Sequence, residues 1–275
     1  MADLLNLVAV LLPAAYVAIF GLYLRHFLNS DESPGFAGSA ALFGVLGLHS
    51  LYMVLLGIET QHFPIATQAE FFSLLALSVG ASYALAERWH RDANTGVFFV
   101  AIVLAFQLLS ALYGGDPGAI PERTRNPVYS THVILTVFGF AGLTVSSLYG
   151  LMYIMLSQQL KSRQLGLIFR RLPPLSVLEK LSKAAMTSGV VLLGLGLALG
   201  HYVAFAQYGQ LNLMDHPTIL VADVAWVGYA VGLIVSRARG LSGTQMGYLA
   251  LFGYLSFMAA MAVVLTQFGA FHTFQ

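Results

Sequence analysis

The chain has 275 residues, of which 58% are hydrophobic and only 9% are charged, whereas a soluble domain carries roughly 25% charged residues. A formal net charge of +1 excludes the strongly basic surface on which nucleic-acid binding depends. The absence of cysteine excludes thiol redox chemistry, disulfides and iron–sulfur clusters.

Apolar runs long enough to cross a bilayer follow one another along the chain. Examples are VVLLGLGLALGHYVAFA and YLALFGYLSFMAAMAVVLTQFGA, and a span needs roughly 20 residues. The first run, MADLLNLVAVLLPAAYVAIF, lacks the positive start and the cleavage site of a signal peptide, so we expect a retained span. The sequence therefore predicts an all-α polytopic membrane helix bundle, one integral membrane domain over 1–275. We place about eight transmembrane helices at 4–25, 38–58, 66–87, 95–114, 129–157, 184–208, 217–236 and 246–271.

The distribution of positive charge predicts the orientation of these spans. All Lys and Arg residues except Arg123 and Arg125 fall in the loops after spans one, three, five and seven. Since Lys and Arg gather on the cytoplasmic side, we expect both termini at the outer face. The inner loop 161–183, which contains RRLPPLSVLEKLSK, is predicted to form a short amphipathic stretch at the membrane surface.

Eight histidines fall at different depths of the predicted bundle. His132 opens span five and His272 closes span eight, both at the outer face. His49 and His201 lie deeper, roughly 13 Å below that surface at 1.5 Å per residue. The others lie at the inner surface or in outer loops: His26, His90, His62 and His216.

The two depth-matched pairs have the chemistry of haem ligands. Neutral imidazole binds metals and serves as an axial ligand of haem iron, so pairs at two depths would suit one or two bis-histidine haems. An ionisable residue within a span usually faces the bundle interior with a partner, and Asp223 and Glu70 are the acidic candidates. The alternative is that these histidines are interhelical hydrogen-bond donors.

Several stretches resemble the cytochrome c assembly membrane proteins of the CcsA/HemX/YpjD type. Residues 48–77, LHSLYMVLLGIETQHFPIATQAEFFSLLAL, are similar to the family's His-bearing span, Pro-containing outer loop and Glu-led span. Residues 131–156, THVILTVFGFAGLTVSSLYGLMYIML, resemble its span that begins with His. Residues 172–200, LPPLSVLEKLSKAAMTSGVVLLGLGLALG, resemble its inner-loop segment and following span, and the terminal FHTF looks like its closing His-Ser-Tyr/Phe.

This resemblance implies haem handling at the outer face of a bacterial inner membrane, with haem b as the cofactor. By position, His132 and His272 are the two outer histidines that ligate the haem iron axially, and His49 matches a deeper histidine of the family. His201 is a candidate on depth alone. Haem-delivering members carry a Trp-Gly…Trp-x-Trp-Asp loop between spans six and seven. Here that loop reads AFAQYGQLNLMDHPTIL, in which only Asp215 could match. The HemX-like and YpjD-like branches of the family also have poor versions of this loop.

The resemblance favours an assembly factor over an enzyme, one that binds haem for transfer or retention during cytochrome c maturation. Because the chain supplies no thiol, haem attachment would need a second cytochrome c assembly membrane protein or the apocytochrome c. The other expected partners are haem and membrane lipid, and no binding of nucleic acid is expected.

Three alternatives stay open. One is a HemX-like regulator, associated with restraint of haem synthesis, or a structural membrane subunit. Another is a cytochrome b-like electron-transfer subunit, against which His26 and His90 count because they lie beside cationic loop residues and outside apolar spans. The third is a transporter, for which the paired broken spans typical of that class are missing.

Overall fold

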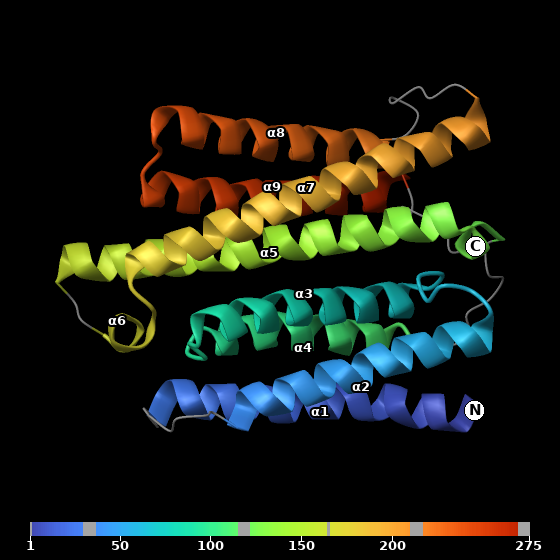
Figure 1. Ribbon diagram of the computed structural model, residues 1–275, viewed down its shortest axis with the longest axis horizontal. Coiled ribbons are helices and arrows are strands. Elements are labelled where there is room, and N and C mark those ends of the chain that lie inside the picture. Colours follow the sequence, from blue (N-terminus) through green and yellow to red (C-terminus); the bar gives the residue numbers. More distant parts are fainter. Residues whose placement is uncertain (1, 30–36, 115–121, 164–165, 210–216, 269–275) are drawn as a thin grey trace. The chain divides into compact units, whose positions relative to one another are not determined.

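The computed structural model describes residues 2–29, 37–114, 122–163, 166–209 and 217–268, and every regular element in these ranges is a helix (Figure 1). The predicted all-α class is therefore confirmed. The elements are α1 (Ala2–Asn29), α2 (Ala37–Thr60), α3 (Gln68–His90), α4 (Gly96–Leu112), the 3-10 helix η1 (Glu122–Arg125), α5 (Pro127–Ser162), α6 (Leu167–Arg171), α7 (Leu175–Tyr208), α8 (Pro217–Arg239) and α9 (Gly243–Phe268).

Seven helices in the described ranges are long and apolar enough to cross a membrane. The polytopic helical bundle expected from the sequence is thereby confirmed. The predicted span 95–114 forms the 17-residue helix α4, about 26 Å long against the roughly 30 Å of a bilayer core. It ends at Leu112, where the sequence continues as YGGDPG, because Gly and Pro do not prolong a helix.

The inner loop differs from its prediction. No separate amphipathic stretch covers 161–183 in the described residues: α6 is short, and α7 begins directly after Pro174. Proline costs nothing at a helix start, where its missing N–H would have no partner. Lys183 pairs with Glu179 at 2.6 Å, one turn apart on α7. The segment LSVLEKLSK is therefore the first part of a 34-residue helix that continues into the membrane.

The described residues form two compact units, and each is considered by itself. Unit 1 contains α1 to α4 and η1; unit 2 contains α5, α7, α8, α9 and most of α6. The single domain over 1–275 stays a prediction. In unit 1, α1 and α3 each pack against α2 and α4, which gives a four-helix arrangement around the fully buried rings of Tyr16, Tyr23, Tyr83 and Phe99.

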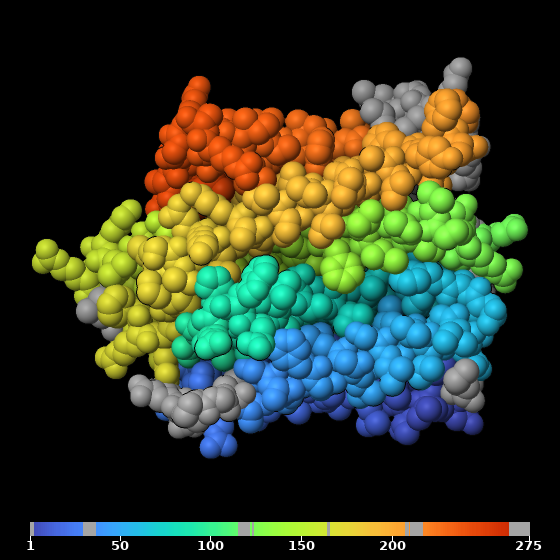
Figure 2. All heavy atoms as spheres, viewed as in Figure 1, coloured from blue at the N-terminus to red at the C-terminus, as the bar shows by residue number. Residues whose placement is uncertain are grey.

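Unit 2 is built on the contact between α5 and α7, which lie side by side (Figures 1 and 2). A Cβ on Gly142 would lie 2.8 Å from the Cα of Gly189, and a Cβ on Gly139 would lie 2.5 Å from the backbone nitrogen of Leu193. Only glycine allows two helix backbones to approach this closely, as in many membrane helix pairs. Of the remaining helices, α9 packs against α5, and α8 packs against both α9 and α7.

Candidate functional site

His132 lies in the second turn of α5, close to the helix start. That start is well defined, because the Asn126 side chain accepts a hydrogen bond from the Val128 N–H at 2.9 Å and Pro127 occupies the first position. The Nδ1 atom of His132 lies 2.7 Å from the Gly196 carbonyl oxygen on α7. A carbonyl only accepts, so Nδ1 carries the hydrogen. Nε2 makes no hydrogen bond within the described ranges and keeps its lone pair while the ring is neutral.

The orientation of the His132 ring is fixed by α7 and by its own helix. A Cβ on Gly200 would lie 2.6 Å from the ring Cε1 and 2.9 Å from Nδ1. The ring therefore rests directly against α7 at Gly200, one helical turn after Gly196. Thr136 donates from its Oγ1 to the His132 carbonyl at 2.7 Å and packs against Gly196. The result is a half-buried imidazole whose position depends on Gly196 and Gly200.

His201 lies on α7, immediately after Gly200, and both of its ring nitrogens have partners. Nδ1 lies 2.8 Å from the Leu197 carbonyl oxygen, and Nε2 lies 3.1 Å from Asp223 Oδ2 on α8. Because the carbonyl accepts from Nδ1, the contact with Asp223 requires a proton either on Nε2 or on the carboxyl group. Asp223 is therefore the acidic partner of His201, as the sequence suggested.

His132 and His201 share a level in unit 2, which differs from the predicted depths. His132 was expected at the surface and His201 roughly 13 Å below it. In the structure each lies within about two turns of a helix end, and the His132 ring contacts Gly196 and Gly200, the residue directly before His201. The difference arises because α7 passes α5 with Gly196 opposite His132, a register that span lengths do not reveal.

His49 is the fully buried centre of a hydrogen-bond group in unit 1. Its Nδ1 lies 2.9 Å from the Tyr16 hydroxyl on α1, and its Nε2 lies 2.8 Å from the Ser73 hydroxyl on α3. A neutral imidazole donates at one nitrogen and accepts at the other, so both contacts are satisfied together. His49 thus links three helices, and iron ligation would displace one of its two partners.

Other predicted site residues are not tested by the structure. His272 and Asp215 lie outside the described residues, as does His216, so the axial pair of His132 with His272 stays a prediction. His49 belongs to unit 1 and His201 to unit 2, so their pairing also stays a prediction. Within the described ranges, no group of three or more His, Asp or Glu side chains gathers to hold a metal ion.

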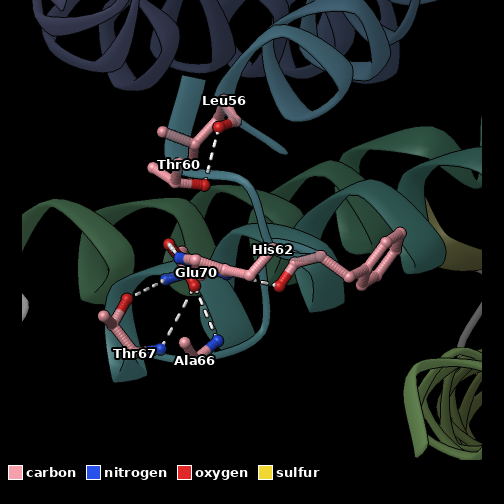
Figure 3. Close-up of polar contacts among 7 residues, drawn as sticks. Leu56, Thr60, His62, Ala66, Thr67 and Glu70 are labelled. Carbon is pink, nitrogen blue, oxygen red and sulfur yellow. Dashed lines mark hydrogen bonds and ion pairs between the residues drawn. The ribbon is translucent and has the colours of Figure 1, made fainter. Parts of the chain in front are cut away.

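A second buried histidine, His62, was assigned from sequence only to an outer loop. Its Nε2 lies 4.0 Å from Glu70 Oε1, and the two side chains are 1% and 10% exposed. Glu70 Oε2 accepts from the backbone N–H groups of Ala66 and Thr67 (Figure 3). The pattern Thr-Gln-Ala-Glu at 67–70 is a capping box, a local signal that fixes Glu70 at the start of a helix but does not reveal its contact with His62.

The predicted inner histidines are found at helix ends. His26 lies in the last turn of α1, and His90 lies in the last turn of α3 beside Arg88. Neither lies within the apolar middle of its helix. An inner haem level, which a transmembrane electron-transfer subunit would need, therefore gains no support from these two residues.

Comparison with known proteins matches most of the chain to one family. A family model described as Cytochrome C assembly protein matches residues 40–269, a range that includes all of α3 to α8. No solved structure matches the chain.

Three relatives illustrate the similarity. Protein HemX of Brevibacillus brevis is 26% identical over 243 residues, which cover 86% of this chain and 88% of that protein. An uncharacterized 28.8 kDa protein of Azospirillum brasilense is 27% identical over 221 residues, 68% of this chain and 80% of its own length. The inner membrane protein YpjD of Escherichia coli K12 is 29% identical over 175 residues, 63% of this chain and 62% of its own length.

Proposed function

Because the chain belongs to the cytochrome c assembly protein family, we propose that it binds haem through histidines near the outer face, for transfer or retention during cytochrome c maturation. It is a multi-pass protein of the bacterial inner membrane, and family membership supports a haem-related role there. The observation that carries the finer proposal is His132, whose Nδ1 is held by Gly196 while Nε2 keeps its lone pair.

His132 fits the requirements of a haem axial ligand. A ligating histidine uses a deprotonated nitrogen and usually donates its other N–H to a carbonyl or carboxylate, which fixes tautomer and orientation. The 2.7 Å contact from Nδ1 to the Gly196 carbonyl is of this kind. Bound haem b would supply a redox-active iron whose potential depends on axial ligands and burial, and the chain would ligate and orient it.

The second ligand follows from the family position of His272, with Asp215 proposed to contact haem from the same outer face. His49 and His201 are proposed as ligands of a deeper haem. At His201, Nε2 would have to leave Asp223, and at His49 either Tyr16 or Ser73 would have to be displaced. Among the described candidates, only His132 has a ring nitrogen that iron could take without displacing a partner.

The proposal is tested by loading the detergent-purified protein with haem b and recording absorption spectra, oxidised and reduced. We expect a low-spin bis-histidine spectrum in the wild type, and its loss in His132→Ala combined with His272→Ala. His90→Ala, in the last turn of α3, is the matched control and should keep the spectrum.

Two other results would count against the proposed site. A spectrum that survives in the double variant would move the haem to His49 and His201. Failure of every form to hold haem would remove the haem-binding proposal.

A structural or regulatory membrane subunit is the second candidate function. It is favoured by His49, because both ring nitrogens are occupied by partners on neighbouring helices, as expected of a residue that stabilises the bundle. On this proposal His49→Gln lowers the stability of the protein, and no haem is retained after gentle purification.

A further inference from the structure

We propose that His62 and Glu70 form a proton-binding site at the outer end of unit 1, and that its single proton holds the 61–66 segment against the start of α3. The site stands apart from the proposed haem ligands and does not depend on them. It rests on the positions of four polar atoms and on what each atom can donate or accept.

The hydrogen on His62 is located by its nearest partner. Nδ1 lies 2.8 Å from the carbonyl oxygen of Phe63, and a carbonyl only accepts, so Nδ1 carries a hydrogen. Nε2 is buried and has no hydrogen-bond partner among the described residues. Nε2 therefore presents a lone pair when the ring is neutral, and an N–H when the ring is charged.

The Glu70 carboxyl group is constrained in the same way. Oε2 accepts from the N–H of Ala66 at 2.6 Å and from that of Thr67 at 3.2 Å. Two donors already point at this oxygen, so a carboxyl proton would have to reside on Oε1. Oε1 is the atom that faces His62 Nε2 at 4.0 Å (Figure 3).

These assignments leave one place for one proton, between Oε1 and Nε2. With the proton on Oε1 the pair is a neutral acid and base; with the proton on Nε2 it is an ion pair. Without it, a carboxylate and an imidazole lone pair face each other while buried, and burying an uncompensated charge is costly. Loss of the proton to outer solvent should therefore favour a conformation in which the 61–66 segment leaves α3 and exposes the carboxylate to water.

No group on the neighbouring helices α2 and α4 supplies a positive charge that could compensate the Glu70 carboxylate in place of the proton. On α2, the Tyr52 hydroxyl is near enough to feel the charge of Glu70, but it is a neutral phenol at ordinary pH. On α4, which carries no charged residue, Ser110 donates to the Ala69 carbonyl at 2.8 Å.

The other charged side chains described at this end of unit 1 point to solvent. They are Asp3 on α1, Glu59 on α2, and Glu122 and Arg125 on η1, all exposed. None of the four is buried beside Glu70, so the compensation has to come from the single proton that Glu70 shares with His62.

The 61–66 segment is well placed to respond. It folds back over α2 so closely that a Cβ on Gly57 would lie 3.2 Å from the His62 carbonyl oxygen. Within the segment Ile65 and Ala66 are buried, and the two amides that bind Glu70 belong to Ala66 and Thr67. Movement of Glu70 toward water would release those amides and the segment together.

The test uses the absence of cysteine from the chain. A spin label on Gln61→Cys, an exposed position next to His62, reports the mobility of the segment in lipid nanodiscs. Spectra are recorded between about pH 5 and pH 10, the range over which carboxyl and imidazole groups in proteins titrate when perturbed. We expect an immobile label at low pH and one transition to a mobile label as the pH rises.

Glu70→Gln is the decisive variant because it mimics the protonated pair. The amide oxygen can accept from Ala66 and Thr67, and the amide NH2 can donate to Nε2, so the label should stay immobile at every pH. Glu59→Gln removes an exposed carboxyl from the same end of unit 1 and should keep the wild-type transition. A Glu70→Gln protein that titrates like the wild type, or a wild type without a transition, would overturn the proposal.

A second measurement on the intact chain keeps the test independent of variant folding. In protein labelled with 15N-histidine, the Nε2 resonance of His62, assigned by its loss in His62→Gln, should move with pH through the midpoint of the label transition. Nδ1 should remain protonated throughout, because the Phe63 carbonyl holds its hydrogen. An Nε2 resonance that does not move over this range would overturn the proposal.

Discussion

Gly200 and His132 lie so close that a Cβ on the glycine would be 2.6 Å from Cε1 of the imidazole. Gly200→Ala therefore has to displace the ring without changing its chemistry. We expect haem binding to weaken by tenfold or more, the usual effect of disturbing a group that orients a metal ligand, as measured by haem titration. Gly228→Ala on α8, where a Cβ meets nothing within 4 Å, should leave binding unchanged. Equal affinity in both variants would show that His132 is not a ligand.

Two buried serines on α3 make different kinds of hydrogen bond, one to a neighbouring helix and one within α3. Ser73 bonds His49 on α2, whereas Ser78 donates to Leu74 within its own helix. We expect Ser73→Ala to lower unfolding stability by about 0.5–2 kcal/mol more than Ser78→Ala, the range for polar contacts between membrane helices. Reversible unfolding in mixed micelles measures the difference; if it is zero, the Ser73 contact does not stabilise the bundle.

Two glycines in different packing environments should respond with opposite sign to the same substitution. A Cβ on Gly142 would lie 2.8 Å from Gly189 Cα, whereas a Cβ on Gly21 meets nothing within 4 Å. We expect Gly142→Ala to cost about 1–3 kcal/mol through overpacking, and Gly21→Ala to stabilise α1 by up to about 1 kcal/mol through helix propensity. Thermal unfolding of both variants is the measurement, and stabilisation by Gly142→Ala would contradict the close approach of α5 and α7.

The orientation predicted from charge can be tested with single cysteines in this cysteine-free chain. A membrane-impermeant thiol reagent applied to spheroplasts should label Gln61→Cys and Glu122→Cys at the outer face. Ser162→Cys at the end of α5 and Ser242→Cys just before α9, both on the predicted inner side, should react only after the cells are lysed. The reverse pattern would place both termini in the cytoplasm and invert every outer assignment made from the positive charges.

Local sequence patterns predicted the helices well because each span satisfies its own backbone within the membrane. The position of His132 at the start of a helix is of this kind. Contacts between helices are set by register and rotation, which single-span hydropathy does not contain. The shared level of His132 and His201, the Tyr16 and Ser73 partners of His49, and the contact of His62 with Glu70 therefore became visible only in the structure.

Helix α5 has 36 residues and is about 54 Å long, whereas the hydrocarbon core of a bilayer is about 30 Å thick. Its final turns, SQQLKS, extend past the lipid, and the Gln159 side chain there accepts from the Phe169 N–H at 3.0 Å. A soluble helical protein could be fused to these turns so that its first helix continues α5 without a break. The rigid fusion would add mass and an asymmetric shape to a chain of only 29.6 kDa. Both properties help to align single particles in electron micrographs.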